Sequence, residues 1–178
     1  MRYPKVKKSH LPIIHIIGLP GAGKTTLGKK LSKEFNLAVF NIGKYRSMFP
    51  SSVAGEADSW FSLFNDLSKQ RWRNCILETT GLNSREYFLR AAFPFPDVLT
   101  IKLVAQRKIL NERIRMKKKS EQGGDWLFSA DFREKFEFVR KMFRQFKEIP
   151  AEIMIDASHK GAQNVFRKAV SGLKSWVP

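Results

Sequence analysis

The chain has 178 residues, a single cysteine, few acidic side chains and no long hydrophobic run. Because Cys75 stands alone, it cannot form an internal disulfide, and no paired Cys/His pattern indicates a metal site. A reducing, cytoplasmic compartment is therefore the expectation. No window approaches about 18 consecutive apolar residues, which excludes a membrane span. Acids number 16 against 33 Lys and Arg, a net charge of +17, which favours polyanions or phosphorylated small molecules as partners.

Length and composition predict one domain over residues 1–178, since 43% of the residues are apolar and 28% are charged. The first ten residues are basic and run into the apolar stretch 11–17, which superficially suggests a signal peptide. That stretch is short, contains His15 and continues into a glycine-rich motif without a small-residue cleavage site. We therefore interpret residues 1–10 as a basic tail that precedes a strand.

Short apolar runs alternate with amphipathic segments along the whole chain. Strands are expected at 13–17, 38–42, 75–77, 98–104 and 153–155, and helices at 25–35, 57–73, 106–119, 131–146 and 161–176. Residues 47–55 and 120–125 have the composition of loops. The phenylalanines between Phe132 and Phe146 recur at helical spacing, which favours a core face over a base-stacking platform. The alternation predicts parallel βαβ units and hence a three-layer α/β domain.

The strongest motif follows the first expected strand. Residues 18–25 read Gly-Leu-Pro-Gly-Ala-Gly-Lys-Thr and match G-x-x-x-x-G-K-[ST], the phosphate-binding P-loop (Walker A), at every fixed position. Glycines in such a loop let backbone amides surround phosphate oxygens, and the following helix contributes its positive end. Lys24 is expected to reach the β- and γ-phosphates, and the Thr25 hydroxyl to hold Mg²⁺. The residues expected to bind ATP here are Gly18, Pro20, Gly21, Ala22, Gly23, Lys24, Thr25 and Thr26.

Two large classes of P-loop protein do not fit the rest of the sequence. A GTPase would carry Asn-Lys-x-Asp, which is missing, and the segment 78–81 (Glu-Thr-Thr-Gly) has Glu where the Asp-x-x-Gly switch has Asp. A motor or AAA-type ATPase is usually larger. The remaining arrangement is that of a small kinase, with a P-loop, an acceptor-binding segment, a basic lid and a fifth strand.

Three further segments carry a family resemblance that spans most of the chain. Residues 39–46 read Val-Phe-Asn-Ile-Gly-Lys-Tyr-Arg, residues 76–86 Ile-Leu-Glu-Thr-Thr-Gly-Leu-Asn-Ser-Arg-Glu, and residues 153–158 Ile-Met-Ile-Asp-Ala-Ser. With the P-loop, they resemble the small P-loop kinases. This group holds polynucleotide kinases, zeta toxins, gluconate and shikimate kinases, and the kinase domain of phosphofructokinase/bisphosphatases. The resemblance implies a P-loop NTPase kinase fold, with strand order 2-3-1-4-5 and a basic helical lid within about residues 106–146.

The resemblance also implies roles for residues on the acceptor side. Arg46 would bind an anionic part of the acceptor or the transferring phosphate, with Tyr45 and Thr80 beside it. Glu78 takes the place of an acid that holds Mg²⁺ through water or polarises the acceptor hydroxyl. From the sequence alone, Glu78 could instead pair with Lys24 or cap the next helix.

On the nucleotide side, the resemblance places Arg113 on the lid helix near the adenine, and Arg115 and residues 117–119 lead into the lid loop. The sequence leaves open whether Arg113 or Arg115 is catalytic. Asp156 and Ser158 would border the adenine. Polynucleotide kinases carry an Asp base two positions before Tyr-Arg, where this chain has Gly43. This departure favours Glu78 as the catalytic base over two weaker candidates, Asp58 and Asp66.

The sequence thus predicts an ATP- and Mg²⁺-dependent kinase that phosphorylates a hydroxyl of a small molecule or nucleotide. One alternative is a 5′-hydroxyl polynucleotide or nucleotide kinase. Another, from a different class, is a nucleic-acid-binding protein that uses ATP as a switch. The spread of the positive charge along the chain keeps nucleic acid open as a substrate or partner.

Overall fold

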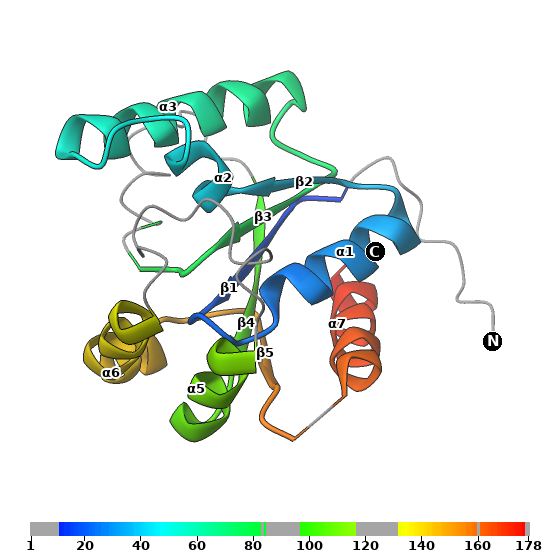
Figure 1. The fold of residues 1–178 in the computed structure, drawn as a ribbon. Helices are drawn as coiled ribbons and strands as arrows, with labels where there is room; N and C mark the ends of the chain where they lie inside the picture. Colours follow the sequence, from blue (N-terminus) through cyan, green and yellow to red (C-terminus); the bar gives the residue numbers. More distant parts are fainter. Residues whose placement is uncertain (1–10, 83, 85–96, 117–131, 160, 177–178) are drawn as a thin grey trace.

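The computed structural model describes residues 11–82, 84, 97–116, 132–159 and 161–176. Strands and helices alternate through these residues, as the sequence predicts (Figure 1). The strands are β1 (Ile13–Gly18), β2 (Ala38–Asn41), β3 (Cys75–Thr79), β4 (Val98–Val104) and β5 (Ile153–Asp156). The helices are α1 (Lys24–Phe35), α2 (Ile42–Arg46), α3 (Val53–Lys69), α5 (Arg107–Met116), α6 (Phe132–Glu148) and α7 (Ala162–Trp176).

All five strands join one parallel sheet in the order β2-β3-β1-β4-β5. This order confirms the expected fold class. The central strand β1 is buried along its whole length, as a strand covered on both faces must be. Because the strands are parallel, the carboxyl ends of β1, β2 and β3 meet at one edge of the sheet. The P-loop leaves β1 at that edge.

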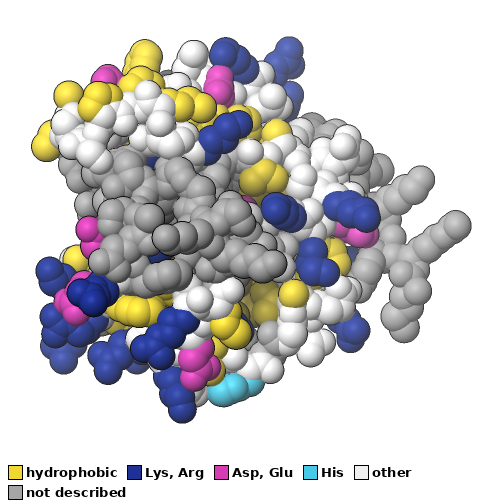
Figure 2. Space-filling view, in the orientation of Figure 1, with side chains coloured by type: hydrophobic (Ala, Val, Ile, Leu, Met, Phe, Trp, Pro, Cys, Tyr) yellow, Lys and Arg dark blue, Asp and Glu magenta, His cyan; other side chains and the backbone are white. Residues whose placement is uncertain are grey.

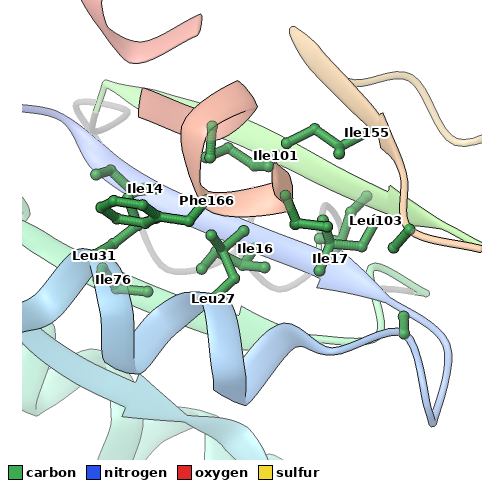
Figure 3. Packing of buried hydrophobic residues seen from close by; sticks show 14 of the residues in the cluster. Ile14, Ile16, Ile17, Leu27, Leu31, Ile76, Ile101, Leu103, Ile155 and Phe166 are labelled. Carbon is green, nitrogen blue, oxygen red and sulfur yellow. The ribbon is translucent and has the colours of Figure 1, made fainter. Parts of the chain in front are cut away.

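Helices cover both faces of the sheet, which gives the three expected layers. On one face, α1 and α7 lie side by side and pack on Ile14 and Ile16 of β1 through Leu27, Leu31 and Phe166 (Figure 3). On the other face, α3 packs on Ile13 and Leu77 through Trp60, Leu63 and Leu67. None of the described helices is long and apolar enough to cross a membrane.

Helix α6 confirms the interpretation of the phenylalanine stripe as a core face. Val139 and Phe146 are buried, and Phe136 and Phe143 pack against the same cluster. The buried Lys102 of β4 holds the end of this helix, since its ammonium donates to the carbonyls of Lys147 (2.9 Å) and Ile149 (2.6 Å). Burial in this position lowers the pKa of Lys102.

Two expectations about the segment after β2 are wrong. The sequence predicts a loop over 47–55 and a helix over 57–73, but α3 spans Val53–Lys69. The Ser52 side chain accepts a hydrogen bond from the backbone N–H of Gly55 (3.0 Å) and so caps the helix four residues earlier than expected. Helix α2 was not predicted. It has only five residues, and Asn41 caps it by accepting from the N–H of Gly43 (2.8 Å).

Candidate active site

The P-loop turns between β1 and α1 as the motif requires. Lys24 folds back over the loop, where its ammonium donates to the carbonyl of Gly18 (2.7 Å) and, at longer range, to that of Leu19 (3.4 Å). Gly21 has φ of 81°, and a Cβ there would overlap the carbonyl oxygen of Leu110 at 2.6 Å. Glycine is therefore required at this position both by the backbone conformation and by the close approach of α5.

Helix α1 begins directly after Gly23, which provides no side-chain cap. The first N–H groups of a helix have no partner within the helix, and they carry its positive dipole end. Pro20 and Gly21 are half-buried and Gly18 and Ala22 are buried, whereas Gly23, Thr25 and Thr26 are exposed. The loop residues predicted to bind phosphate thus form one continuous turn at the carboxyl edge of the sheet.

The P-loop follows β1, and the ends of the neighbouring strands β2 and β3 bring an amide and a carboxylate to it. Glu78 of β3 is only 1% exposed, and its Oε2 accepts hydrogen bonds from the Thr25 hydroxyl (3.0 Å) and the Asn41 amide (2.9 Å). Asn41 ends β2 directly beside Glu78 in the sheet register. The structure therefore brings Thr25 and Glu78 together, and it adds Asn41 to the site. Lys24 donates to the backbone carbonyls of Gly18 and Leu19, and the hydrogen bonds that Glu78 accepts come from Thr25 and Asn41.

The donor set at this point fits a hard divalent cation. Glu78 Oε1 is buried and has no hydrogen-bond partner among the described residues, and the Thr25 oxygen lies beside the same carboxylate. Among the residues that the structure describes, no cluster of three or more His, Cys, Asp or Glu could hold a metal by itself. Mg²⁺ suits such a site, because it commonly uses one or two protein oxygens together with waters and substrate phosphates.

The predicted adenine-side residues also meet. The Arg113 guanidinium donates to the carbonyl of Ala157 (2.6 Å) and more weakly to that of Ser158 (3.3 Å). The Ser158 hydroxyl accepts from the backbone N–H of Gln106 (2.9 Å), and the Ser158 N–H donates to Asp156 (2.8 Å). These contacts tie the segment after β5 to α5, the helix that packs on Gly21.

The second candidate arginine lies elsewhere. The Arg115 guanidinium is 5.3 Å from the centre of the Phe136 ring, so it stacks between α5 and α6. The expected loop at 120–125, the end of the preceding expected helix at 117–119 and the basic tail at 1–10 fall outside the described residues. Of the two arginines, Arg113 is thus the one that contacts the segment after β5.

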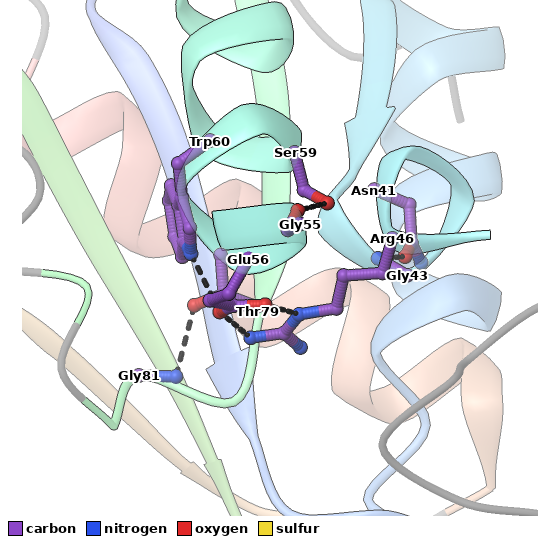
Figure 4. A network of polar contacts seen from close by, with 9 residues as sticks. All are labelled: Asn41, Gly43, Arg46, Gly55, Glu56, Ser59, Trp60, Thr79 and Gly81. Carbon is purple, nitrogen blue, oxygen red and sulfur yellow. Dashed lines mark hydrogen bonds and ion pairs between the residues drawn. The ribbon is translucent and has the colours of Figure 1, made fainter. Parts of the chain in front are cut away.

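On the acceptor side, the structure places the predicted residues in a network of their own. Arg46 is buried and forms a bidentate ion pair with Glu56, at 2.8 Å from Nε and 2.6 Å from Nη2 (Figure 4). Trp60 donates its indole N–H to the same carboxylate (2.8 Å). The Arg46 side chain therefore contacts a protein carboxylate in the position where the sequence suggested an acceptor anion.

Tyr45 and Asp66 form a second pair on this side. The Tyr45 hydroxyl donates to Asp66 (2.9 Å), and burial together with this bond raises the pKa of Tyr45. Hydrogen bonds from Lys69 and Tyr45 lower the pKa of Asp66, which makes it a poorer proton acceptor. Thr80 is half-buried just after β3, and Asp58 is exposed on α3. Within the described part of the chain, neither aspartate is hydrogen-bonded to Thr25, Asn41 or Glu78.

A buried histidine supports the end of β3. The His15 imidazole and the Thr79 hydroxyl are 2.8 Å apart, and the Thr79 oxygen also accepts from the N–H of Gly81 (2.9 Å). Burial lowers the pKa of His15 from 6.5 to about 3, so the ring is neutral at ordinary pH. The contact fixes the turn that follows Glu78.

Sequence reasoning missed Asn41, Gly28 and Glu56. Asn41 lies within the quoted acceptor segment, where its position at a strand end was the available signal. Gly28 lies in α1 against Glu78, and a Cβ there would overlap Glu78 Oε1. Glu56 pairs with Arg46 across two helices, and no local pattern predicts that contact.

Comparisons with known proteins agree with this geometry. No protein-family model matches the chain. The chain is 28% identical over 110 residues to a shikimate kinase of Azobacteroides pseudotrichonymphae genomovar. CFP2, a match that covers 57% of this chain and 64% of that protein. The match therefore spans less than two thirds of the curated relative.

Solved structures with the same fold include shikimate kinases and a gluconokinase. A shikimate kinase from Bacteroides thetaiotaomicron has a TM-score of 0.64 at 18% identity, over 93% of this chain and 99% of that one. A gluconokinase from Sinorhizobium meliloti 1021 gives 0.65 at 12% identity, over 93% of each chain. The shikimate kinase from Acinetobacter baumannii in complex with shikimate gives 0.64 at 16% identity, over 93% of this chain and 94% of that one. At these identities the likeness establishes a P-loop kinase fold.

Proposed function

We propose that this chain is a kinase that transfers the γ-phosphate of ATP, with Mg²⁺, to a hydroxyl group of a small molecule. The observation that carries the proposal is the meeting of Thr25 and Glu78 at the P-loop, with the Oε2–hydroxyl distance of 3.0 Å. A glycine-rich loop alone could bind many phosphates. A buried carboxylate fixed on the loop threonine adds the oxygen donors that a magnesium–nucleotide complex needs.

The curated relative and the related structures support the class of acceptor. They are named as shikimate kinases and a gluconokinase, which favours a small hydroxyl-bearing acceptor over a polymer. On the proposed acceptor side, Tyr45 and Arg46 bind the carboxylates of Asp66 and Glu56.

The residues of this chain have separate tasks in the proposed reaction. Lys24 neutralises charge on the β- and γ-phosphates, and the α1 amides hold phosphate oxygens. Thr25 and Glu78 would hold Mg²⁺, which when bound supplies further charge neutralisation at the phosphates. Arg113 positions the segment after β5 through the carbonyl of Ala157, and Asp156 and Ser158 complete that segment as the adenine border.

Phosphoryl transfer makes modest demands on such a site. Its transition state is loose, so positioning and charge stabilisation supply most of the rate. Glu78 is fixed by its two hydrogen bonds, from Thr25 and Asn41. We therefore assign it to the Thr25 side of the site, where it orients the Thr25 hydroxyl. We propose that the acceptor side is formed by Tyr45, Arg46 and Thr80. Arg46 would act there indirectly, because its pair with Glu56 holds α2 against α3.

The positive surface favours a second candidate, a kinase that acts on a 5′-hydroxyl of a nucleotide or polynucleotide. Figure 2 shows Lys and Arg side chains gathered over α5 and α6. The exposed cations of these helices are Arg107, Lys108, Arg115, Arg133, Arg140, Lys141, Arg144 and Lys147. A nucleic-acid-binding protein with an ATP switch would use the same surface. Such binding would weaken steeply with salt and survive Lys24→Ala.

A transfer assay tests the proposed function directly. Labelled ATP would be offered with free and phosphorylated sugars, hydroxyl-bearing carboxylic acids including shikimate and gluconate, nucleosides, nucleoside monophosphates, and 5′-hydroxyl RNA and DNA oligonucleotides. We expect label on one class of small molecule, lost in Lys24→Ala. Label on oligonucleotides would support the second candidate. Salt-sensitive binding of oligonucleotides with no transfer to any acceptor would favour the ATP switch and overturn the kinase proposal.

A further inference from the structure

The end of β2 makes a contact with the site that the motif does not require. Asn41 uses both ends of its amide: Nδ2 donates to Glu78 Oε2 (2.9 Å), and Oδ1 accepts from the N–H of Gly43 (2.8 Å). One contact reaches the carboxylate at the P-loop, and the other caps α2. The side chain is half-buried and the two contacts point to opposite partners, so its orientation is fixed.

We propose that Asn41 is a positioning residue that holds the Glu78 carboxylate against Thr25 and links this carboxylate to the start of α2. The inference rests on the proposed function and deepens it, since it concerns how the chain prepares its magnesium–nucleotide site. Asn41 itself need not contact the nucleotide. It acts through Glu78.

The donor from Asn41 matters because Glu78 is otherwise poorly supported. The carboxylate is 1% exposed, and among the described residues only Thr25 and Asn41 donate to it, both to Oε2. Oε1 has no partner in that part of the chain. Hydrogen bonds to a charged group are about twice as strong as neutral ones. Removal of the Asn41 donor therefore leaves a buried carboxylate held only by the Thr25 hydroxyl. The proposed Mg²⁺ would need the oxygen of that same hydroxyl.

Gly28 shows that the orientation of the carboxylate is built into the fold. A Cβ at Gly28 would overlap Glu78 Oε1, although the helix interior would otherwise favour alanine. The absence of a side chain leaves room for the carboxylate between α1 and β3. Asn41 thus holds the Glu78 carboxylate by a hydrogen bond, and Gly28 leaves the space that the carboxylate occupies.

The chemistry of asparagine is specific for this double task. Serine is also a good N-cap, so Asn41→Ser can still accept from the helix N–H, but its shorter side chain does not reach Glu78. Alanine loses both contacts. Comparison of Asn41→Ser with Asn41→Ala therefore measures the cap, and comparison of Asn41→Ser with the parent chain measures the donation to Glu78.

The test is calorimetric binding of ADP to the full chain, with and without Mg²⁺, for the parent and the two variants. We expect Mg²⁺ to tighten ADP binding in the parent, and this gain to shrink about five- to tenfold in Asn41→Ser. ADP binding without Mg²⁺ should change less than about twofold, and the melting temperature should fall by less than in Asn41→Ala, because serine keeps the cap. Asn41→Ala should lose the same gain and also melt earlier. A purely structural role would lower stability without changing the response to Mg²⁺.

Three results would count against the inference. An unchanged Mg²⁺ gain in Asn41→Ser, with normal ADP binding, would overturn it and leave the proposed function standing. Equal weakening of ADP binding with and without Mg²⁺ would assign Asn41 to loop structure alone. If the parent chain bound ADP in neither condition, the proposed function would fail, and the inference would fail with it.

Discussion

Two carboxylates in this chain, the buried Glu78 and the half-buried Glu56, differ in how their oxygens are hydrogen-bonded. Both oxygens of Glu56 are engaged, by two nitrogens of Arg46 and by the Trp60 indole. Glu78 receives both of its hydrogen bonds on Oε2, and its Oε1 has no partner among the described residues. In the α2–α3 network of Arg46, Glu56 and Trp60, both carboxylate oxygens are therefore hydrogen-bonded, whereas in the P-loop cluster of Thr25, Asn41 and Glu78 only one is.

This difference separates a structural polar group from a functional one. A buried polar atom without a partner costs about 1–3 kcal/mol, and proteins tolerate that cost mainly where function requires it. A complete network has no such need and stabilises the fold. The predicted acceptor arginine thus joins α2 to α3 through Glu56, and we propose that the predicted metal acid, Glu78, belongs to a ligand site.

The largest expected effect is on the ligand side. Lys24→Ala removes the cation proposed to face the β- and γ-phosphates, and we expect phosphoryl transfer to fall on the order of 10³-fold. Steady-state transfer of labelled phosphate measures it. Lys33→Ala, an exposed change on the same helix, is the control and should keep full activity. Equal activity of Lys24→Ala and the parent chain would contradict the role of the P-loop.

A change in the α2–α3 network should lower the free energy of unfolding. Glu56→Ala leaves the Arg46 guanidinium buried without its carboxylate, and we expect the free energy of unfolding to fall by about 3 kcal/mol. Glu137→Ala is a matched control, because Glu137 pairs with Arg140 at the surface, where both side chains are more than half exposed. That change should cost less than about 1 kcal/mol. Urea unfolding measures both. Similar losses in the two variants would mean that the Arg46–Glu56 pair contributes no more to the free energy of unfolding than an exposed pair does.

Acid should weaken the fold through His15, which contacts Thr79 at the end of β3. Burial lowers the pKa of His15 from 6.5 to about 3, so the unfolded chain takes up a proton below pH 6.5 that the folded chain refuses. The stability from neutral His15 is complete above pH 6.5 and falls as the pH drops toward 3. By pH 5 the loss is about 2 kcal/mol.

Urea unfolding at pH 7 and pH 5 measures this loss. His15→Gln cannot titrate, so the stability difference between the parent chain and this variant should shrink by that amount at pH 5. A difference that stays constant with pH would show that His15 titrates normally in the folded chain.

The smallest expected effect tests the space at Gly28. Gly28→Ala should lower the free energy of unfolding by about 1–2 kcal/mol, because the new Cβ meets Glu78 Oε1. In a Glu78→Ala background the same change should be neutral or stabilise the helix by up to about 1 kcal/mol. Chemical unfolding of the four proteins completes the cycle. The same loss in both backgrounds would show that Gly28 does not accommodate the carboxylate.

Much of the fold follows from local patterns. Strand β1 and the P-loop are read from a continuous apolar run and a fixed motif, and the strand order follows from the family resemblance. The start of α3 was misplaced because one capping serine, Ser52, decides it. Helix α2 is too short to show a helical period.

The site was predicted only in part, for a physical reason. Thr25 and Glu78 stand in motifs at strand ends, where parallel topology brings side chains together. Asn41, Gly28 and Glu56 act through partners on other elements, and single-sequence patterns do not report such pairings. The sequence also could not show that Arg46 would meet Glu56, which lies ten residues further along on a different helix.

The central claim is that Glu78 belongs to a ligand site and Glu56 to the fold. The most direct test is the melting temperature of Glu78→Gln and Glu56→Gln, each with and without Mg²⁺ and ADP. We predict that Glu78→Gln melts no earlier than the parent without ligand and loses most of the Mg²⁺-dependent rise. Glu56→Gln should melt earlier and keep that rise. If Glu78→Gln kept the full rise, or if both variants lost stability and the rise together, the distinction between the two carboxylates would be wrong.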